Sequence, residues 1–471
     1  MKAHRLLLAG ALALSAGCTG SEDEPTPAPA DVSYARPWEQ RPVVDLRFDL
    51  SSGLDTVEGS ETVRFTAERR VCGLVFRLWA NKPETVAFGS ELEVTAASVD
   101  GRSVTPHYAA AGAPASTQGS LLRLPLQHCL RPGHGTTATL DFVLRLGEHA
   151  AERLGWAPDL AWFGTGFPVL GWQRGRGWAT NPVVNQKGET ASSEAFRLRS
   201  LEVVVPQQYE VVATGERLPR RPGTEPGTAV ESFRAPSVRD VAVTVGELTT
   251  YELETEGGVR LHVSGPADGT GTALADWAHE ADRAIAEISA LLGPYPYPDL
   301  WLSVIPDCPT GIEFPGAIQF TDLPAGHDAF ELLVSHEVAH MWFYSLIGNN
   351  QGTSPWLDEA LATYVQQVVD DTLTTTPPSI IPAVRGHVGE PMTWYARPEV
   401  SLAYAQGVYR QGAAMLAEAR TTVGAETFDR LLRDYVAAQA HRIATPDDFA
   451  AAFADAAPRA VSVFRSYGAI D

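Results

Sequence analysis

Two histidines lie four positions apart in the sequence, with a glutamate directly after the first: His336, Glu337 and His340. On an α-helix, residues four apart lie on one face, about 6 Å apart along the axis. Two imidazoles placed in this way can bind one Zn²⁺ ion at about 2.0–2.1 Å, with Glu337 beside them as a general base. The pattern therefore predicts a zinc site, although so short a pattern also arises by accident among ordinary core and surface residues.

The element that must carry this pair is predicted to be a helix. Residues 329–346 contain neither proline nor glycine, and Asp328 precedes them as a candidate N-cap. Gly348 follows as a stop signal. The sequence therefore predicts one helix across the whole of 329–346.

A second helix is predicted to supply the third metal ligand. Ser354 is a candidate N-cap and Pro355 a candidate first helical residue. Glu359 then falls in the first turns, nineteen positions after His340. A short connection would fold this helix back across the first and bring the carboxylate to the same metal. Two histidines and one glutamate leave a fourth position open for water, which is the arrangement of catalytic zinc sites.

These residues resemble the aminopeptidase N-like family of zinc gluzincins. The resemblance rests on the His-Glu-x-x-His pattern, on Glu359 within Trp-Leu-Asp-Glu-Ala, and on two further stretches. Residues 311–316 (Gly-Ile-Glu-Phe-Pro-Gly), which are predicted to form a loop bounded by glycines, resemble the family's Gly-Met-Glu exopeptidase motif. Residues 409–413 (Tyr-Arg-Gln-Gly-Ala) resemble its Tyr-x-Lys-Gly-Ala segment. Four motifs in the family's order make an accidental match very improbable.

The resemblance implies a zinc aminopeptidase that removes the N-terminal residue from peptide substrates, with one zinc ion per chain. Glu337 would take a proton from water and deliver it to the leaving amine. Glu313 would pair with the free α-ammonium of the substrate, with Gly311 and Ile312 also contacting the substrate. Tyr409 would donate its hydroxyl to the developing oxyanion.

Three points leave alternatives open. Tyr404 competes with Tyr409, because both are followed by glycine three residues later. Ile312 stands where the family usually has methionine, and Gln411 where it usually has lysine. If Glu313 does not hold an amine, the same scaffold would serve a zinc endopeptidase. A non-catalytic surface binding protein with a peptidase fold is a further alternative, although such a role requires none of the zinc motif.

Composition restricts the class of partner. The chain has 471 residues, 44% hydrophobic, and a formal net charge of −21. Nucleic acid is excluded as a partner, because phosphate binding requires a basic surface. The length allows two or three domains with sizeable cores.

The N-terminus predicts export. Lys2 and Arg5 precede an apolar run over residues 6–16, which is too short to be a lasting membrane span. The run ends in Leu-Ser-Ala-Gly-Cys, which resembles a bacterial lipobox with Cys18 as the lipidated residue. We therefore predict a signal segment at 1–18, a disordered tether at 19–34, and a lipid-anchored protein of the cell envelope. An ordinary cleaved secretory signal is the alternative.

The remaining chain is predicted to be multidomain. Residues 35–265 read as many short strands separated by turns, which indicates an antiparallel β-sandwich or saddle. Residues 266–471 mix strands and helices, as in a thermolysin-like α+β zinc peptidase domain ending in a short helical segment. The resemblance implies a short bacterial member without the long C-terminal helical repeat domain of larger relatives.

Two features of the strand-rich part have two interpretations each. Cys72 and Cys129 could form a disulfide in an oxidising compartment or be two buried thiols. The segment 153–196 concentrates tryptophan and glycine. Its tryptophans would either form an aromatic rim over the active site or fill gaps in a packed loop.

Overall fold

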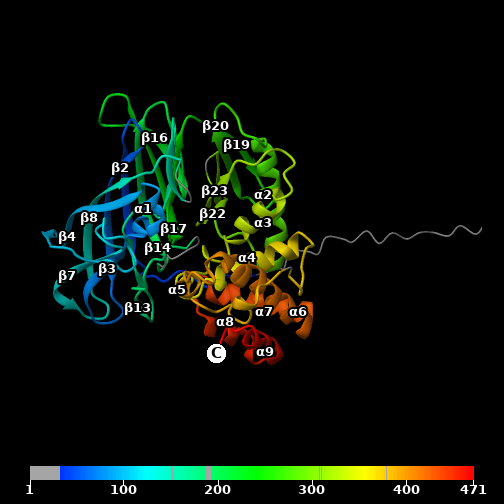
Figure 1. The fold of residues 1–471 in the computed structure, drawn as a ribbon. Coiled ribbons are helices and arrows are strands. Elements are labelled where there is room, and N and C mark those ends of the chain that lie inside the picture. The colour runs from blue at the N-terminus through cyan, green and yellow to red at the C-terminus, as the bar shows by residue number, and fades with distance from the viewer. Residues whose placement is uncertain (1–31, 150–152, 187–192, 307, 309, 378) are drawn as a thin grey trace, which may run out of the picture.

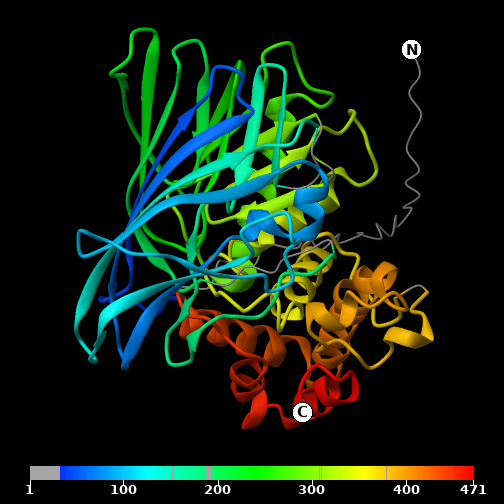
Figure 2. The same ribbon diagram turned by 60° about the vertical axis from the view of Figure 1, so that its left-hand side comes forward.

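The structure is a computed structural model that describes residues 32–149, 153–186, 193–306, 308, 310–377 and 379–471 (Figures 1 and 2). The sheets of the first half lie together on one side, and the helices of the second half lie beside and below them in Figure 1. The predicted signal segment and residues 19–31 of the tether are outside the described residues. In the part of the chain that is described, every helix is too short or too polar to cross a bilayer.

The largest sheet forms from strands whose side chains alternate between core and solvent. In β2, for example, Val57, Val63 and Phe65 are buried while their neighbours along the strand are more exposed. This period of two is typical of a sheet with one face on the core. The strand order is β16 (Glu216–Pro222), β17 (Thr228–Val238), β14 (Phe196–Pro206), β1 (Val43–Leu50), β2 (Thr56–Thr66), β8 (Gly135–Arg145), β4 (Glu91–Val99) and β5 (Arg102–Ser103).

Smaller sheets complete the first half. One has the order β15 (Glu210–Ala213), β18 (Ala242–Gly246), β10 (Leu160–Gly164) and β9 (Leu154–Ala157). Another has the order β11 (Val169–Leu170), β3 (Val71–Arg77), β7 (Leu121–Leu130) and β6 (His107–Ala109). A hairpin pairs β12 (Trp172–Gln173) with β13 (Gly177–Trp178), and a short helix α1 (Pro83–Ala87), which the sequence did not predict, follows β3.

The structure decides between the interpretations of the cysteines and tryptophans. Cys72 on β3 and Cys129 on β7 form a disulfide across that sheet. Trp162 and Trp172 are fully buried in the core of the first half, and Trp172 packs edge-on against Trp178 with ring centroids 4.7 Å apart. These tryptophans therefore fill the core, as the packed-loop alternative requires.

The second half is built on a mixed sheet with the order β19 (Leu248–Glu254), β20 (Arg260–Pro266), β21 (Asp299–Ile305), β23 (Ala317–Thr321) and β22 (Gly311–Phe314). Helix α2 (Leu274–Leu292) packs on it through apolar residues at helical spacing, such as Trp277, Ala281 and Ile288, and Gly293 at φ 108° ends it. The predicted division at residue 265 stays a prediction. The strand pairing, however, places β19 and β20 in the sheet of the second half.

The first metal-bearing helix is shorter than predicted. Helix α3 runs from Phe330 to Ala339, with Ala329 rather than Asp328 at its N-cap, and His340 lies at its C-cap. Residues 341–347 form wide turns, although they contain no proline or glycine. Local propensity therefore does not end this helix; contacts from elsewhere in the chain do.

Helix α4 (Trp356–Val369) folds back against α3 as predicted, with Pro355 at its N-cap in place of Ser354. The remaining helices are α5 (Met392–Tyr395), α6 (Gln411–Val423), α7 (Ala425–Gln439), α8 (Pro446–Ala454) and α9 (Pro458–Ser466). A π-helical turn, Ala405–Arg410, leads into α6. A sheet-rich first half followed by a mixed α and β half with terminal helices confirms the predicted fold class, except that the largest sheet is not purely antiparallel, because β1 and β14 pair in parallel.

Glu61 is predicted to make the stability of the first half depend on pH. Its side chain is 1% exposed, lies in register between Leu46 of β1 and Leu140 of β8, and neither oxygen has a hydrogen-bond partner among the described residues. Burial raises the pKa of this carboxyl well above its usual value, so folding takes up a proton. The unfolding free energy should therefore fall, by up to about 1.4 kcal/mol per pH unit, as the pH rises from about 4.3 towards the folded pKa.

Thermal unfolding of the wild type and of Glu61→Gln between pH 5 and 8 measures this effect. The difference in melting temperature, Glu61→Gln minus wild type, should increase as the pH rises. Glu58→Gln on the same strand is the matched control, because Glu58 is exposed and should leave the pH dependence unchanged. Parallel curves for the wild type and Glu61→Gln would contradict the prediction.

Candidate active site

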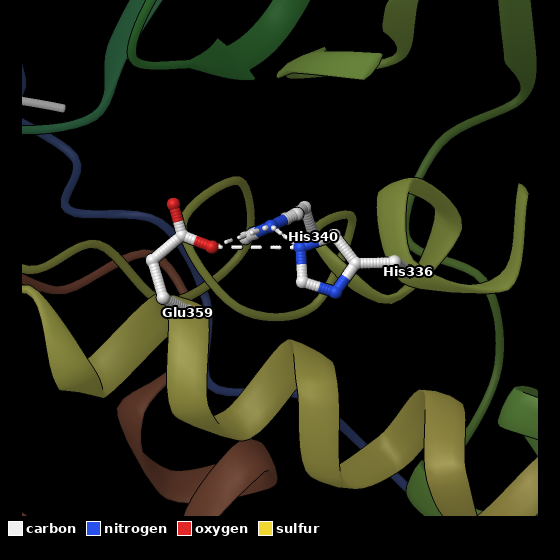
Figure 3. Close-up of side chains that lie close together, drawn as sticks. All are labelled: His336, His340 and Glu359. Carbon is white, nitrogen blue, oxygen red and sulfur yellow. Dashed lines mark hydrogen bonds and ion pairs between the residues drawn. The ribbon is translucent and has the colours of Figure 1, made fainter. Parts of the chain in front are cut away.

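Three predicted metal ligands converge on one point between α3 and α4 (Figure 3). The Nε2 atoms of His336 and His340 are 3.2 Å apart, and Oε2 of Glu359 is 3.5 Å from each of them. His336 and His340 come from the end of α3, and Glu359 comes from the first turn of α4. The spacing in sequence and the fold-back of α4 thus bring the three atoms together.

A zinc ion fits this triangle. A point equidistant from the three atoms lies about 2.0 Å from each, which is close to the ligand distance of zinc, about 2.0–2.1 Å. Oε2 of Glu359 is buried and has no hydrogen-bond donor among the described residues, so its negative charge faces the centre of the triangle. Two imidazoles and one carboxylate are also the donor set of catalytic zinc sites with an open fourth position.

Glu313, Glu337 and His340 form a second group whose ligand atoms lie within 4.8 Å of one another. The two groups share His340 but differ in donors. Zinc prefers nitrogen donors in combination with one carboxylate, so the group with both histidines fits it better than the group with two carboxylates. The second group is better suited to chemistry beside the metal.

The electrostatic field of the site attracts positive charge. Burial lowers the pKa of His340, but Glu313 and Glu359 outweigh it, so the pKa lies well above its usual value. Burial raises the pKa of Glu359, but the two imidazoles lower it more, so this carboxyl stays ionised. In the absence of a metal a proton is held at this point, and a divalent cation would replace it.

Glu337 points from α3 towards β22. The residue is 4% exposed, and a Cβ atom added at Gly311 would lie 2.4 Å from its Cγ. Glycine at position 311 therefore makes room for the Glu337 side chain. Burial raises the pKa of Glu337 well above its usual value; His340 opposes this, while Glu313 and Glu359 add to it.

Glu313 lies on strand β22, not on the loop that the sequence predicted. It pairs in register with Ile318 of β23, because apolar neighbours such as Ile312 and Phe314 bury this segment as an edge strand. Its carboxylate is 4% exposed, and Oε1 has no hydrogen-bond partner among the described residues. A buried unpartnered oxygen that lines a pocket is available to a ligand cation.

Tyr409 and Tyr404 both line the site, from the π-helical turn and the residue before it. The Tyr409 ring stacks on His336 with centroids 5.8 Å apart, and it packs edge-on against Tyr404 at 5.6 Å. Burial and the nearby Glu359 raise the pKa of Tyr409 well above its usual value, so its hydroxyl keeps the proton and can donate it in a hydrogen bond. Because Tyr409 contacts the metal ligand His336, it is better placed than Tyr404 to donate a hydrogen bond to a group bound at the metal.

Two further carboxylates that lie near the ligands in sequence, Glu331 and Asp358, make no hydrogen bond to the histidines among the described residues. Glu331 is exposed on the first turn of α3. Asp358 is buried and accepts hydrogen bonds from Gln351 and from the backbone N–H of Glu359, so it holds the start of α4. Burial, together with Glu359, raises the pKa of Asp358 to about 8.

The three metal ligands line one pocket of about 600 Å³ together with Glu313, Glu337, Tyr404 and Tyr409. The sequence missed one charged member, Arg153, whose guanidinium lies over the rings of Trp79 and Phe314 at 4.6 and 5.3 Å. Arg153 belongs to the first half of the chain and lowers the pKa of Glu337. No local pattern around Arg153 marks it, because only the packing of the two halves brings it to the site.

Comparison with known proteins identifies the second half. Residues 288–467 match the model of the Peptidase family M1 domain. This part of the second half is therefore similar to a peptidase family M1 domain. This range contains Gly311, the His-Glu-x-x-His pattern, Glu359 and Tyr409, so the resemblance to the aminopeptidase N-like family is confirmed for this part.

Two curated aminopeptidases are similar to part of this chain. Aminopeptidase M1 of Arabidopsis thaliana is 27% identical over 239 residues, which cover 45% of this chain and 27% of that protein. Aminopeptidase M1-A of Oryza sativa subsp. japonica is 26% identical over 182 residues, which cover 34% of this chain and 21% of that protein. The chain thus spans about a quarter of the length of these relatives.

Solved structures share the fold of nearly the whole chain. The M1 zinc metallopeptidase from Deinococcus radiodurans has a TM-score of 0.63 and 18% identity, covering 93% of this chain and 96% of that chain. A mutant M1 zinc metallopeptidase from the same organism, bound to a Tyr-Ser-Ala substrate, has a TM-score of 0.64 and 18% identity, covering 94% and 98%. The fold of an M1 metallopeptidase therefore extends through the first half.

Single substitutions can identify the carboxylate that binds the metal. Glu359→Gln should weaken zinc binding more than 100-fold, beyond the roughly 10–100-fold effect of outer-shell changes, because it removes a charged ligand. Glu313→Gln should leave zinc binding nearly unchanged, because Glu313 belongs to the other group. Competition with a chromophoric chelator measures both constants. A large loss in Glu313→Gln with little change in Glu359→Gln would show that the metal lies between Glu313, Glu337 and His340 instead.

Proposed function

We propose that the chain is a zinc-dependent aminopeptidase that hydrolyses the first peptide bond of peptides. The observation that carries this proposal is the content of one pocket: a zinc-type triangle of ligands, a buried carboxylate beside it, and a second buried carboxylate, Glu313, whose Oε1 has no partner among the described residues. The relatives that match residues of the M1 domain are named aminopeptidases, which supports the same conclusion.

Glu313 would hold the α-ammonium group of the substrate. A charge-assisted hydrogen bond to a buried carboxylate is strong, and it requires a free amine at that place. Strand β22 is an edge strand, so an extended peptide can run beside it with its backbone hydrogen-bonded to the sheet. Holding the amine at Glu313 places the first peptide bond, and not a later one, near the metal ligands.

Glu337 would handle the proton of the attacking water. Bound zinc supplies a Lewis acid that polarises the scissile carbonyl and makes a water molecule more acidic. Glu337 accepts the water proton and passes it to the nitrogen of the leaving amine as the carbon–nitrogen bond breaks. Its buried position, which raises its pKa, favours holding that proton between the two steps.

Tyr409 would stabilise the negative charge on the former carbonyl oxygen by donating its hydroxyl. The raised pKa keeps this hydroxyl protonated across the pH range in which peptides are cleaved. Stacking on His336 fixes the direction of the ring relative to the metal site. Tyr404 packs against this ring and would support it.

The pocket rim suits an apolar stretch of substrate. Leu332 and Leu402 are 49% and 98% exposed, and both line the pocket that holds the metal ligands. Large apolar side chains exposed beside a site of chemistry are typical of contact surfaces for a ligand. We infer that the residues following the cleaved bond contact these two leucines.

Replacement of Glu313 tests the aminopeptidase proposal. For a panel of aminoacyl chromogenic amides, Glu313→Gln should lower kcat/KM at least 100-fold, because the isosteric amide removes the charge that binds the ammonium group. Zinc content should remain full. N-acetylated versions of the same amides should be poor substrates for the wild type, and the variant should no longer distinguish them from the free amines.

The other outcomes select the alternatives. Cleavage of blocked or longer peptides by the zinc-loaded wild type, without cleavage of free aminoacyl amides, would replace the proposal with an endopeptidase. Wild-type protein that binds no zinc and cleaves nothing would leave a binding protein with a peptidase fold.

We further propose that the protein is exported and anchored to the cell envelope by a lipid on Cys18. The lipobox-like sequence around Cys18 supports this proposal, and so does the disulfide between Cys72 and Cys129, since such bonds persist in oxidising compartments.

Expression in a bacterial host with a radiolabelled fatty acid tests the anchor. The wild type should incorporate the label and partition into detergent, and Cys18→Ser should be unlabelled and released in soluble form. Cys308→Ser serves as the control, because Cys308 is buried in the folded protein and should not affect labelling. Equal labelling of Cys18→Ser and the wild type would contradict the proposal.

A further inference from the structure

The orientation of His340 depends on one carbonyl group. Its Nδ1 lies 3.1 Å from the carbonyl oxygen of Phe343. A carbonyl only accepts hydrogen bonds, so Nδ1 must donate, and the neutral imidazole then has its lone pair on Nε2. Nε2 is the atom that faces His336 and Glu359. The position of the Phe343 carbonyl therefore sets both the tautomer and the direction of this ligand.

The segment that carries this carbonyl leaves the α-helical pattern directly after Phe343, whose N–H still donates to the carbonyl of Ala339, four residues back. After α3 ends, Ser345 and Leu346 donate to the carbonyls of His340 and Met341, five residues back. Tyr344 has φ 87°, a conformation that side-chain-bearing residues rarely adopt. A strained backbone of this kind persists only where surrounding contacts enforce it.

Two adjacent residues of the first half supply these contacts. They are Arg239 and Asp240, which lie between β17 and β18 and are 2% and 1% exposed. Figure 1 shows β17 on the side of the first half that faces the second. We call their side chains the Arg239–Asp240 clamp.

Asp240 holds the Tyr344 side chain. Its Oδ2 accepts hydrogen bonds from the hydroxyl of Tyr344 at 2.9 Å and from that of Thr165 at 2.6 Å. Its Oδ1 accepts from the backbone N–H of Val241 at 2.8 Å. Both oxygens of this buried carboxylate thus accept hydrogen bonds, and one of these bonds holds the hydroxyl end of the Tyr344 side chain.

Arg239 holds the backbone that follows. Its Nε donates to the carbonyl of Ser345 at 3.1 Å, and its Nη2 donates to that of Leu346 at 3.3 Å. Its Nη1 donates to the carbonyl of Ser193 at 2.8 Å, so the guanidinium is itself anchored in the first half. A Cβ atom at Gly348 would lie 2.1 Å from Nη1, so glycine is required at that position for this approach.

We propose that the Arg239–Asp240 clamp positions the metal ligand His340 by holding residues 344–346, and hence the Phe343 carbonyl, in their non-helical conformation. The proposal rests on the proposed zinc site. Arg239, Asp240 and Tyr344 are positioning residues, since their side chains act on the ligand through the backbone. The first half of the chain then helps to set the metal affinity of a site whose ligands all come from the second half.

The test is zinc affinity in Tyr344→Phe, which deletes only the hydroxyl that contacts Asp240. The zinc dissociation constant, measured by chelator competition well below the melting temperature, should rise about 10-fold or more, as for other changes in groups that orient a metal ligand. The absorption spectrum of the cobalt(II)-substituted protein should shift, because the geometry of His340 at the metal changes.

Tyr209→Phe is the matched control, because the Tyr209 hydroxyl donates to Asp159 at the same distance of 2.9 Å, away from the site. Its zinc constant and cobalt spectrum should equal those of the wild type. A second variant, Asp240→Asn, should raise the zinc constant in the same direction as Tyr344→Phe, since an amide cannot accept at both oxygen positions.

The failures are distinguishable. If the wild type binds zinc tightly, and Tyr344→Phe and Asp240→Asn bind it as the wild type does, the clamp is overturned while the proposed function stands. A lower melting temperature with an unchanged zinc constant has the same meaning, because a purely structural role would give that result. If the wild type binds no zinc, the proposed function fails and the clamp fails with it.

Discussion

Three buried carboxylates share the active-site pocket, and their mutual repulsion is the constraint on which the site depends. Glu313, Glu337 and Glu359 are each 4% exposed and all line this pocket. Carboxylates this close cannot all stay ionised away from water unless positive charge lies among them. The site therefore requires cations, and the proposed reaction provides two: a zinc ion at Glu359 and a substrate ammonium at Glu313. Glu337 lies beside both, which is where a group that exchanges a proton is useful.

The geometry that gathers these charges has local and distant parts. The positions of His336, His340 and Glu359 depend on residues close in sequence. Helical spacing on α3 and one turn of the chain back to α4 are enough to bring the three side chains together. Strand pairing fixes Glu313, because β22 must lie in register with β23. Arg153 comes from the first half, and its guanidinium lies between Trp79 of that half and Phe314 of the second half. The positive charge of Arg153 offsets part of the repulsion that the carboxylates would otherwise feel.

The sequence predicts the parts whose determinants are local. The metal ligands and Glu337 follow from spacing, the two tyrosines follow from the family resemblance, and the strands of the first half follow from alternation of polar and apolar residues. Glu313 was predicted on a loop because its flanking glycines suggest a turn, yet Ile312 and Phe314 pack inwards and make a strand. Arg153 and Asp240 could not be predicted. A buried charged residue is identified by its partners, and these partners are distant in sequence.

The error at the end of α3 has the same origin. Residues 341–346 contain neither proline nor glycine, so local rules extend the helix to Leu346. The structure ends it at Ala339, because hydrogen bonds from Arg239 and Asp240 compensate for the lost helical ones and for the positive φ of Tyr344. The region that matches the M1 domain, residues 288–467, contains every proposed metal ligand but neither Arg239 nor Asp240. The ligand set is therefore a property of the second half alone, and its orientation is a property of both halves together.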